Sequence, residues 1–340
     1  MAIDCEDPSL GDLLAAVGPG LFSALPCQAI APAAQVIEAA DPDEPLQAAV
    51  SRMWWKQVGA LAVVADGALV GSLSEDDLLR VAAGRLAALG ERVVSAGPEL
   101  SVWDELLAAL RVGDAMTPNS ELPRAATTSP LLDGVEQIAA PGSGGTRSRH
   151  LWLVSERGGV VRVISIRDIA RYLTRLYDGQ FPGEAFPSAA RCASASRLGA
   201  AVLDLPIGAI RERIALGGKP VVVPLDASGA ETVRRMWQDG RGYAIALLSD
   251  GAPVGICTRR DLLRALRHPF AKLGDLRAAR LMTLRVKTVT DVDTLCGLFK
   301  LMAIEGCRHM PLVDEEDRVE CVISMWEAVA LLAPRPEPGR

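Results

Sequence analysis

The fold of this chain is decided by the stretch Val254-Gly255-Ile256-Cys257-Thr258-Arg259-Arg260-Asp261-Leu262-Leu263-Arg264, because the same pattern occurs four times. In each copy an apolar strand leads to a Ser or Thr, and an acid follows three residues later at the start of an apolar helix. Such repetition predicts a repeat protein whose copies pack against one another. The Ser/Thr and acid of the four copies are Ser74 and Asp77, Ser165 and Asp168, Thr258 and Asp261, and Ser324 and Glu327.

A second marker, an apolar residue followed by a glycine, opens each copy. It precedes the Ser or Thr by about 50 residues in the last three copies and by somewhat more in the first. The odd copies share an Arg-Met-Trp run, at 52–54 and 235–237, whereas the even copies share an Arg-His pair. We infer a duplicated pair, and therefore two modules of two repeats each. The marker glycines are Gly11, Gly113, Gly208 and Gly274.

Within a copy, the apolar pattern predicts an α+β unit with the order β-α-β-β-α. One small sheet cannot bury both of its faces, so the copies should pack in pairs. An Ala-, Ser- and Pro-rich stretch predicts a linker between the two modules. The expected divisions are a first module at 1–178 with repeats 10–92 and 112–178, an extra helix at 101–111, a linker at 179–204, a second module at 205–333 with repeats 205–270 and 271–333, and a disordered tail at 334–340.

Charge and composition exclude several classes of protein. The chain has 36 Lys and Arg against 42 Asp and Glu, and this net charge of −6 argues against a nucleic-acid binder. An anionic ligand would therefore need a local basic cluster. No apolar run reaches the roughly 18 residues of a membrane helix, and the acidic N-terminus is unlike a signal peptide. The 7 cysteines lack CxxC spacing, which predicts reduced thiols in the cytoplasm and no structural metal.

The four copies resemble cystathionine-β-synthase (CBS) domains, which pair into Bateman modules, and their number resembles that of the γ regulatory subunit of AMP-activated protein kinase. The resemblance covers nearly the whole chain, from Leu10 to Leu332. It implies that the Ser/Thr and Asp of a copy bind the ribose and phosphate side of an adenine nucleotide. In this chain those roles would fall on Ser74, Asp77, Ser165, Asp168, Thr258 and Asp261.

The Arg-His pairs are further candidates for ligand binding. The γ subunit carries a His-Arg pair that contacts phosphate in its even repeats, and here the order is reversed, in Arg149-His150 and Arg308-His309. Both side chains can contact a phosphate near neutral pH. A solvated strand entrance is the structural alternative for these pairs. Gly71 and Gly255 are also candidates, because a position without a side chain would let an adenine ring approach the backbone.

The motif also has a purely structural interpretation. Ser/Thr-x-x-Asp/Glu before an apolar run is a capping box, which stabilises the start of a helix by about 1 kcal/mol. Arg162 replaces the glycine in the second copy, and Cys321 replaces it in the fourth. The fourth copy also has Glu327 in place of Asp. Capping alone explains the fourth motif, and we expect no ligand there.

We expect an adenine-nucleotide sensor that binds AMP, ADP or ATP, with Mg²⁺ accompanying ATP, and that modulates an unidentified protein. A homodimer is expected, and neither nucleic acid nor a membrane is an expected partner. The alternative is a ligand-free scaffold that uses the repeats for oligomerisation or partner assembly. An enzyme is not expected, because the sequence shows no nucleophile elbow, metal triad or dinucleotide-binding fingerprint.

Overall fold

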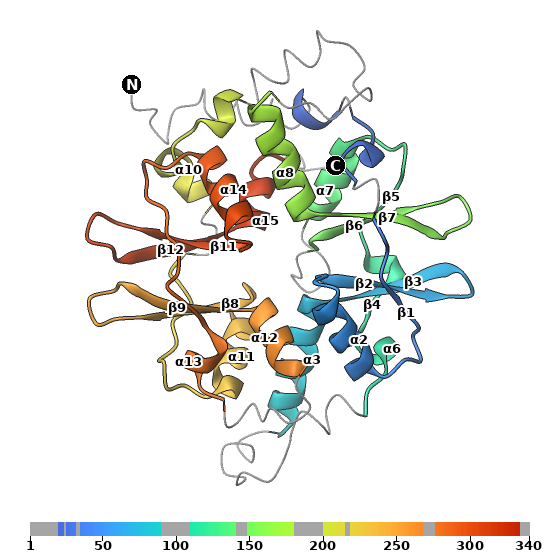
Figure 1. Ribbon diagram of the computed structural model, residues 1–340, viewed down its shortest axis with the longest axis horizontal. Helices are drawn as coiled ribbons and strands as arrows, with labels where there is room; N and C mark the ends of the chain where they lie inside the picture. The colour runs from blue at the N-terminus through green and yellow to red at the C-terminus, as the bar shows by residue number, and fades with distance from the viewer. Residues whose placement is uncertain are drawn as a thin grey trace, which may run out of the picture.

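The computed structural model describes residues 20–23, 25–31, 35–89, 109–140, 148–179, 200–214, 218–267 and 276–333. Four small sheets lie across the middle of the molecule, with helices above and below them (Figure 1). The α+β prediction is confirmed. The marker glycines Gly11 and Gly274, the tail, and most of the linker and of the extra helix lie outside the described residues.

Each repeat is built around an antiparallel hairpin followed by a helix. The hairpins are β2–β3, β6–β7, β8–β9 and β11–β12, and the motif Ser or Thr ends the second strand in each. The first repeat comprises β1 (Ala39–Ala40), α2 (Leu46–Trp55), β2 (Ala60–Ala65), β3 (Ala68–Ser74) and α3 (Glu75–Leu89). The second comprises α6 (Val112–Ala115), β4 (Thr117–Pro118), η2 (Asn119–Glu121), β5 (Arg124–Ala126), α7 (Leu131–Ala139), β6 (His150–Val154), β7 (Val160–Ser165) and α8 (Ile166–Tyr177).

The second half of the chain repeats this arrangement. The third repeat comprises α10 (Ile207–Ile214), α11 (Gly229–Gln238), β8 (Tyr243–Leu247), β9 (Pro253–Thr258) and α12 (Arg259–Leu266). The fourth comprises α13 (Ala278–Leu281), β10 (Thr283–Leu284), α14 (Leu295–Ile304), β11 (His309–Val313), β12 (Val319–Ser324) and α15 (Met325–Ala330). A short 3-10 helix, η1 (Cys27–Ala29), precedes the first repeat. None of the helices within the described ranges is long and apolar enough to cross a membrane.

The two repeats of a module exchange their leading segments. Strand β4, which opens the second repeat, pairs with β3 of the first, and β10 of the fourth pairs with β9 of the third. Conversely, α10, which opens the third repeat, joins the fourth, where the amide of Ile207 donates to the Asp293 carbonyl at 2.7 Å. A backbone hydrogen bond also links the hairpins within each module, from Leu69 to Gly158 and from Val319 to Gly251. Each pair of repeats is therefore one intertwined unit.

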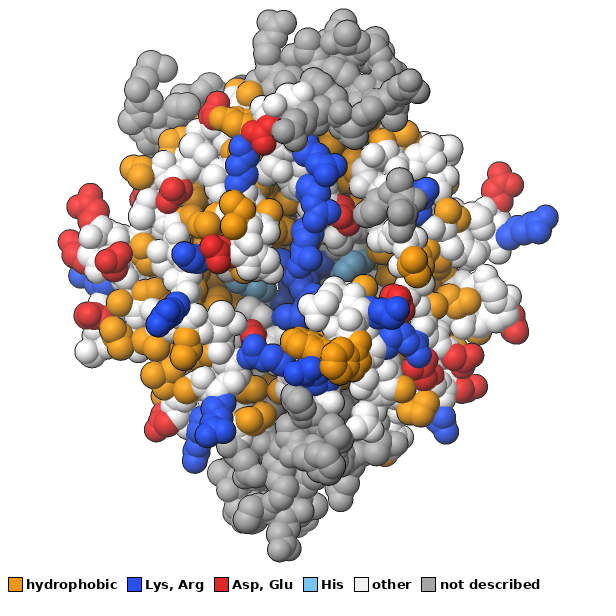
Figure 2. All heavy atoms as spheres, viewed as in Figure 1, with side chains coloured by type: hydrophobic (Ala, Val, Ile, Leu, Met, Phe, Trp, Pro, Cys, Tyr) orange, Lys and Arg blue, Asp and Glu red, His pale blue; other side chains and the backbone are white. Residues whose placement is uncertain are grey.

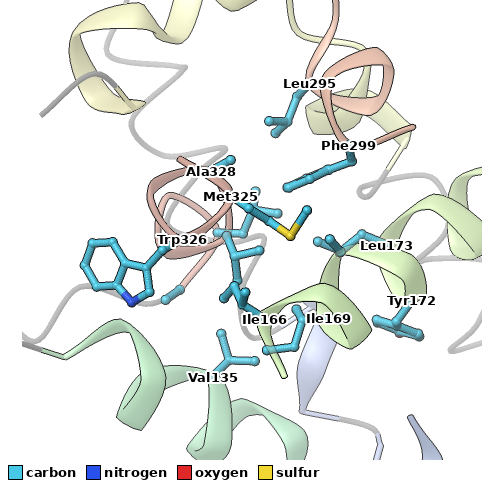
Figure 3. Packing of buried hydrophobic residues seen from close by; sticks show 14 of the residues in the cluster. Val135, Ile166, Ile169, Tyr172, Leu173, Leu295, Phe299, Met325, Trp326 and Ala328 are labelled. Carbon is cyan, nitrogen blue, oxygen red and sulfur yellow. The ribbon is translucent and has the colours of Figure 1, made fainter. Parts of the chain in front are cut away.

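The apolar core lies between the two modules. One cluster of buried side chains unites the main helices of the odd repeats, α2, α3, α11 and α12, and another unites those of the even repeats, α7, α8, α14 and α15. The leading helices α6, α10 and α13 each join the cluster of the repeat to which they are exchanged. In the second cluster Met325 of α15 and Phe299 of α14 pack toward Leu173 of α8 (Figure 3). Because each cluster draws on both modules, burial of apolar surface holds the two modules together and brings their four motifs toward a common centre.

Candidate ligand-binding site

The register of the four hairpins places equivalent residues beside each motif. Across the strands, Ser165 pairs with His150 and Ser324 pairs with His309, so each even repeat sets its histidine opposite the motif serine. The preceding Arg149 and Arg308 stand at the entrance of their strands, and their carbonyls accept the amides of Ile166 and Met325, each at 2.9 Å. The Arg-His pairs of the even repeats are therefore held rigidly beside the start of a motif helix.

Five arginines from three repeats gather at the centre, and we name them the central arginine cluster. Figure 2 shows basic side chains running down the middle of this face, with histidine on either side of a hollow. Only Glu75 and Asp76, the first two residues of α3, pair with the cluster among the described residues. The cluster therefore has more guanidinium groups than carboxylates. Its members are Arg149, Arg167, Arg259, Arg260 and Arg308.

The two carboxylates each bridge two arginines. The Nη2 of Arg308 lies 3.2 and 3.0 Å from the carboxylate oxygens of Glu75, and the Nε of Arg260 lies 2.5 Å from one of them. Asp76 pairs with Arg149 and with Arg259. All these contacts except that with Arg149 cross from the first module to the second, so the cluster is a polar junction between modules.

Burial and neighbouring charges shift the pKa values of several groups at this centre. Burial opposes the ionisation of Glu75, but the guanidinium groups of Arg308, Arg260 and Arg149 outweigh it and lower the pKa of this carboxyl. Burial and the neighbouring Arg149 lower the pKa of Arg259 to about 9. Burial and Arg308 lower the pKa of His150 to about 4. At neutral pH the arginines are cationic and His150 is neutral.

Three cavities open around this centre, and each has a motif acid in its wall. The cavity at Asp77 has a volume of about 290 Å³ and includes Arg149 and His150 of the second repeat. The cavity at Asp168 is smaller, at about 160 Å³. The cavity at Asp261 is the largest of the three, at about 410 Å³, and includes both Arg308 and His309. Each Arg-His pair thus faces the motif acid of its partner repeat.

The predicted capping boxes are present at all four motifs. In each, the backbone amide and the hydroxyl of the Ser or Thr donate to one oxygen of the acid at 2.6–2.9 Å. The second oxygen of Asp77 accepts from Thr117 at 2.6 Å, and that of Asp261 accepts from Thr283 at 3.4 Å. Each of these second oxygens also pairs with an arginine of its own helix at 3.1 Å, Arg80 at Asp77 and Arg264 at Asp261. The threonine contact is the weaker one at Asp261 because it is the longer.

The repeats match a known protein family. The family model described as CBS domain matches residues 35–84, 216–268 and 276–334. This chain is a CBS-domain protein. The second repeat lies outside the three matches, yet its hairpin has the same register as the others. The two modules accordingly have the organisation of paired CBS domains.

Solved structures support this fold for the whole chain. A Methanocaldococcus jannaschii protein, described as a candidate archaeal homolog of g-AMPK, superposes with a TM-score of 0.66 and 17% identity, covering 90% of this chain and 99% of that one. An uncharacterized conserved protein of Pyrococcus horikoshii superposes with a TM-score of 0.52 and 15% identity, covering 91% and 100%. Among curated proteins, an uncharacterized Methanopyrus kandleri protein is 24% identical over 124 residues, which span 36% of this chain and 61% of that protein.

Gly71 and Gly255, the two glycines of the CBS motif, lie against neighbouring strands, whereas the sequence predicted an adenine ring beside them. A Cβ at Gly71 would lie 2.6 Å from the Thr117 carbonyl oxygen, and one at Gly255 would lie 3.0 Å from Leu284. Both glycines therefore face the exchanged strands β4 and β10. The residues that line the cavities at Asp77 and Asp261 do not include them.

The same exchange explains the departures from the motif. In the even repeats β7 and β12 are edge strands in the described sheets, with no strand equivalent to β4 or β10 beside them. Arg162 and Cys321 therefore replace the glycine in strands that have no such exchanged strand beside them. The close approach that requires glycine at positions 71 and 255 is therefore that of a strand, and a role of these glycines in admitting an adenine ring stays a prediction.

Sequence reasoning missed the residues that form the centre of the site. Glu75, Asp76, Arg167, Arg259 and Arg260 occupy the two positions between the Ser or Thr and the acid in the first three repeats. The fourth repeat has Met325-Trp326 there, and both are buried. A comparison of these two positions across the four copies would have revealed the contrast in charge.

Proposed function

We propose that the protein is a regulatory sensor that binds an adenine nucleotide in the cavity at Asp261. The volume of about 410 Å³ falls within the roughly 300–1,000 Å³ typical of small-molecule sites. Thr258 and Asp261 would hold the ribose, whose vicinal hydroxyls are donors suited to a carboxylate. The phosphate would lie on Arg259, Arg260 and Arg308, together with His309.

The observation that carries this proposal is the unbalanced charge of the central arginine cluster. The protein as a whole is acidic, with a net charge of −6, so a cluster with surplus guanidinium groups needs a specific reason. Arg167 makes no ion pair with any described residue, and Nη1 of the buried Arg259 has no hydrogen-bond partner there. Guanidinium groups in a partly enclosed cavity are the preferred protein partners of phosphate.

Regulation would follow from the composition of the cavity wall. Trp54, Gln57 and Glu75 come from the first module, whereas Thr258 and Arg308 come from the second. A ligand that contacts both modules favours the arrangement to which it binds best, and this differential affinity is what a partner would detect. The partner is an unidentified protein, and the homodimer stays a prediction.

The other cavities rank below this one. The cavity at Asp77, at about 290 Å³, is the second candidate, whereas about 160 Å³ at Asp168 is small for a nucleotide. No group of three His, Cys, Asp or Glu in the described ranges is arranged to hold a metal ion. Any Mg²⁺ would therefore arrive with the phosphates of ATP.

Isothermal titration with AMP, ADP, ATP and adenosine tests the proposal. AMP should bind more tightly than adenosine, and replacing Arg308 and His309 by alanine should remove most of that difference. Arg318→Ala is the matched control, because Arg318 is half-exposed and pairs with Asp314 and Glu316. If no nucleotide binds at millimolar concentration, the alternative of a ligand-free scaffold is favoured. The capping interactions already made by all four motif acids are the observation behind that alternative.

A further inference from the structure

The site proposed for an anion already contains an acid. Glu75 is 4% exposed and lines the cavity at Asp261, where its carboxylate contacts Arg308 and Arg260. A phosphate placed on these two arginines would meet a carboxylate of the same sign on the same donors. Like charges at such distances repel one another, and more strongly in a buried site than in water.

This acid is a feature of one repeat alone. At the equivalent position after the motif Ser or Thr, the second repeat has Ile166, the third has Arg259 and the fourth has Met325. Glu75 is therefore not required by the capping box or by the start of the helix. Its contacts are those of an internal counter-anion, supplied by the first module to arginines of the second.

The geometry points to Glu75, assisted by Asp76, as the residue that sets which phosphate ligand the central arginine cluster accepts. This inference rests on the proposed function, since it concerns the same site. Two of the five cationic charges are already matched by carboxylates. The surplus suits one phosphate group, which carries a charge of about −2 at neutral pH. A triphosphate brings more negative charge than the surplus can match, so Glu75 favours AMP over ATP.

The contacts also identify the arginines for which Glu75 and a bound phosphate would compete. Arg308 and Arg260 are shared between Glu75 and an incoming phosphate, so a polyphosphate can engage them fully only by displacing the carboxylate. Glu75 contacts only Nη2 of Arg308 and Nε of Arg260, so a single phosphate can use the other N–H groups of these two arginines without that displacement. Arg167 and Nη1 of Arg259, which are uncommitted to any described acid, add further donors for it. Removing the charge of Glu75 should therefore benefit ATP more than AMP.

The test is the ratio of the dissociation constants for ATP and AMP in Glu75→Gln, which keeps the shape and one acceptor oxygen but removes the charge. We expect the ratio to fall at least tenfold, while affinity for adenosine stays within twofold. Glu316→Gln is the control, because Glu316 is an exposed acid paired with an arginine far from the cluster. An unchanged ratio in a folded Glu75→Gln protein overturns the inference.

Two further arms separate this inference from the proposed function. If Glu75→Gln does not fold, Asp76→Asn replaces it, since Asp76 is more exposed and should shift the ratio in the same direction. If the native protein binds no nucleotide, the proposed function fails, and inorganic tripolyphosphate becomes the probe. Tighter binding of tripolyphosphate to Glu75→Gln than to the native protein supports the counter-anion role, and equal binding refutes it.

Discussion

Replacing Gly71 by alanine should destabilise the fold without touching the ligand cavity. The new Cβ would lie 2.6 Å from the Thr117 carbonyl oxygen and 2.7 Å from Sδ of Met116. The methionine can move, but the carbonyl belongs to β4, which pairs with β3 at this residue. Overpacking of this kind costs about 1–3 kcal/mol, and the smaller entropy of the unfolded alanine chain offsets about 0.4–1 kcal/mol. A net loss of about 1–2 kcal/mol is expected.

The midpoint of urea unfolding measures this loss, and Gly84→Ala is the matched control. Gly84 lies on α3, and a Cβ there would have no neighbour within 4 Å beyond the backbone of its own helix. Alanine at this position should therefore stabilise the helix by up to about 1 kcal/mol. Nucleotide affinity should be unchanged in both variants. A Gly71→Ala protein with native stability but weakened nucleotide binding would refute this reasoning and restore the role of Gly71 in admitting adenine.

Two further predictions concern the site. Asp261→Ala should weaken AMP binding by about 1.5–3 kcal/mol, which is the range for hydrogen bonds to a charged group, and Asp261→Asn should have an intermediate effect. If calorimetry shows native affinity for AMP in variants that melt at a lower temperature, Asp261 is a capping residue only. His150 has a pKa of about 4 in the folded protein and about 6.5 unfolded. Because the unfolded state binds the extra proton in that window, the native protein should lose more stability than His150→Gln as pH falls from 6.5 toward 4. Equal losses in urea titrations would contradict the lowered pKa.

Local features of the fold could be predicted from the sequence, because they depend on residues close together in the chain. Ser324 and Glu327 are three residues apart, and that spacing alone predicts their capping box. The hairpins likewise follow from apolar runs on either side of a short turn. Together with the four-fold repetition, these elements indicate the resemblance to CBS domains.

Features that depend on distant contacts could not be predicted. Strands β4 and β10 are each two residues long, so they have no periodicity to detect. A glycine within a strand, such as Gly71, indicates that another group approaches the backbone closely. The sequence alone does not show whether that group is a ligand or a neighbouring strand. The pairing of Glu75 with Arg308 joins residues 233 positions apart. Glu75 begins α3 of the first repeat and Arg308 precedes β11 of the fourth, so their proximity follows from the packing of one module against the other.

A crystal structure of the protein with AMP tests the central claim most directly. The account predicts the ribose hydroxyls on Asp261 and the phosphate on Arg259, Arg260 and Arg308, with no nucleotide at Glu327. A nucleotide bound in the fourth repeat, with its ribose on Glu327, would contradict the prediction that the fourth motif serves only as a helix cap. A phosphate that lies away from the central arginine cluster would contradict the central claim itself.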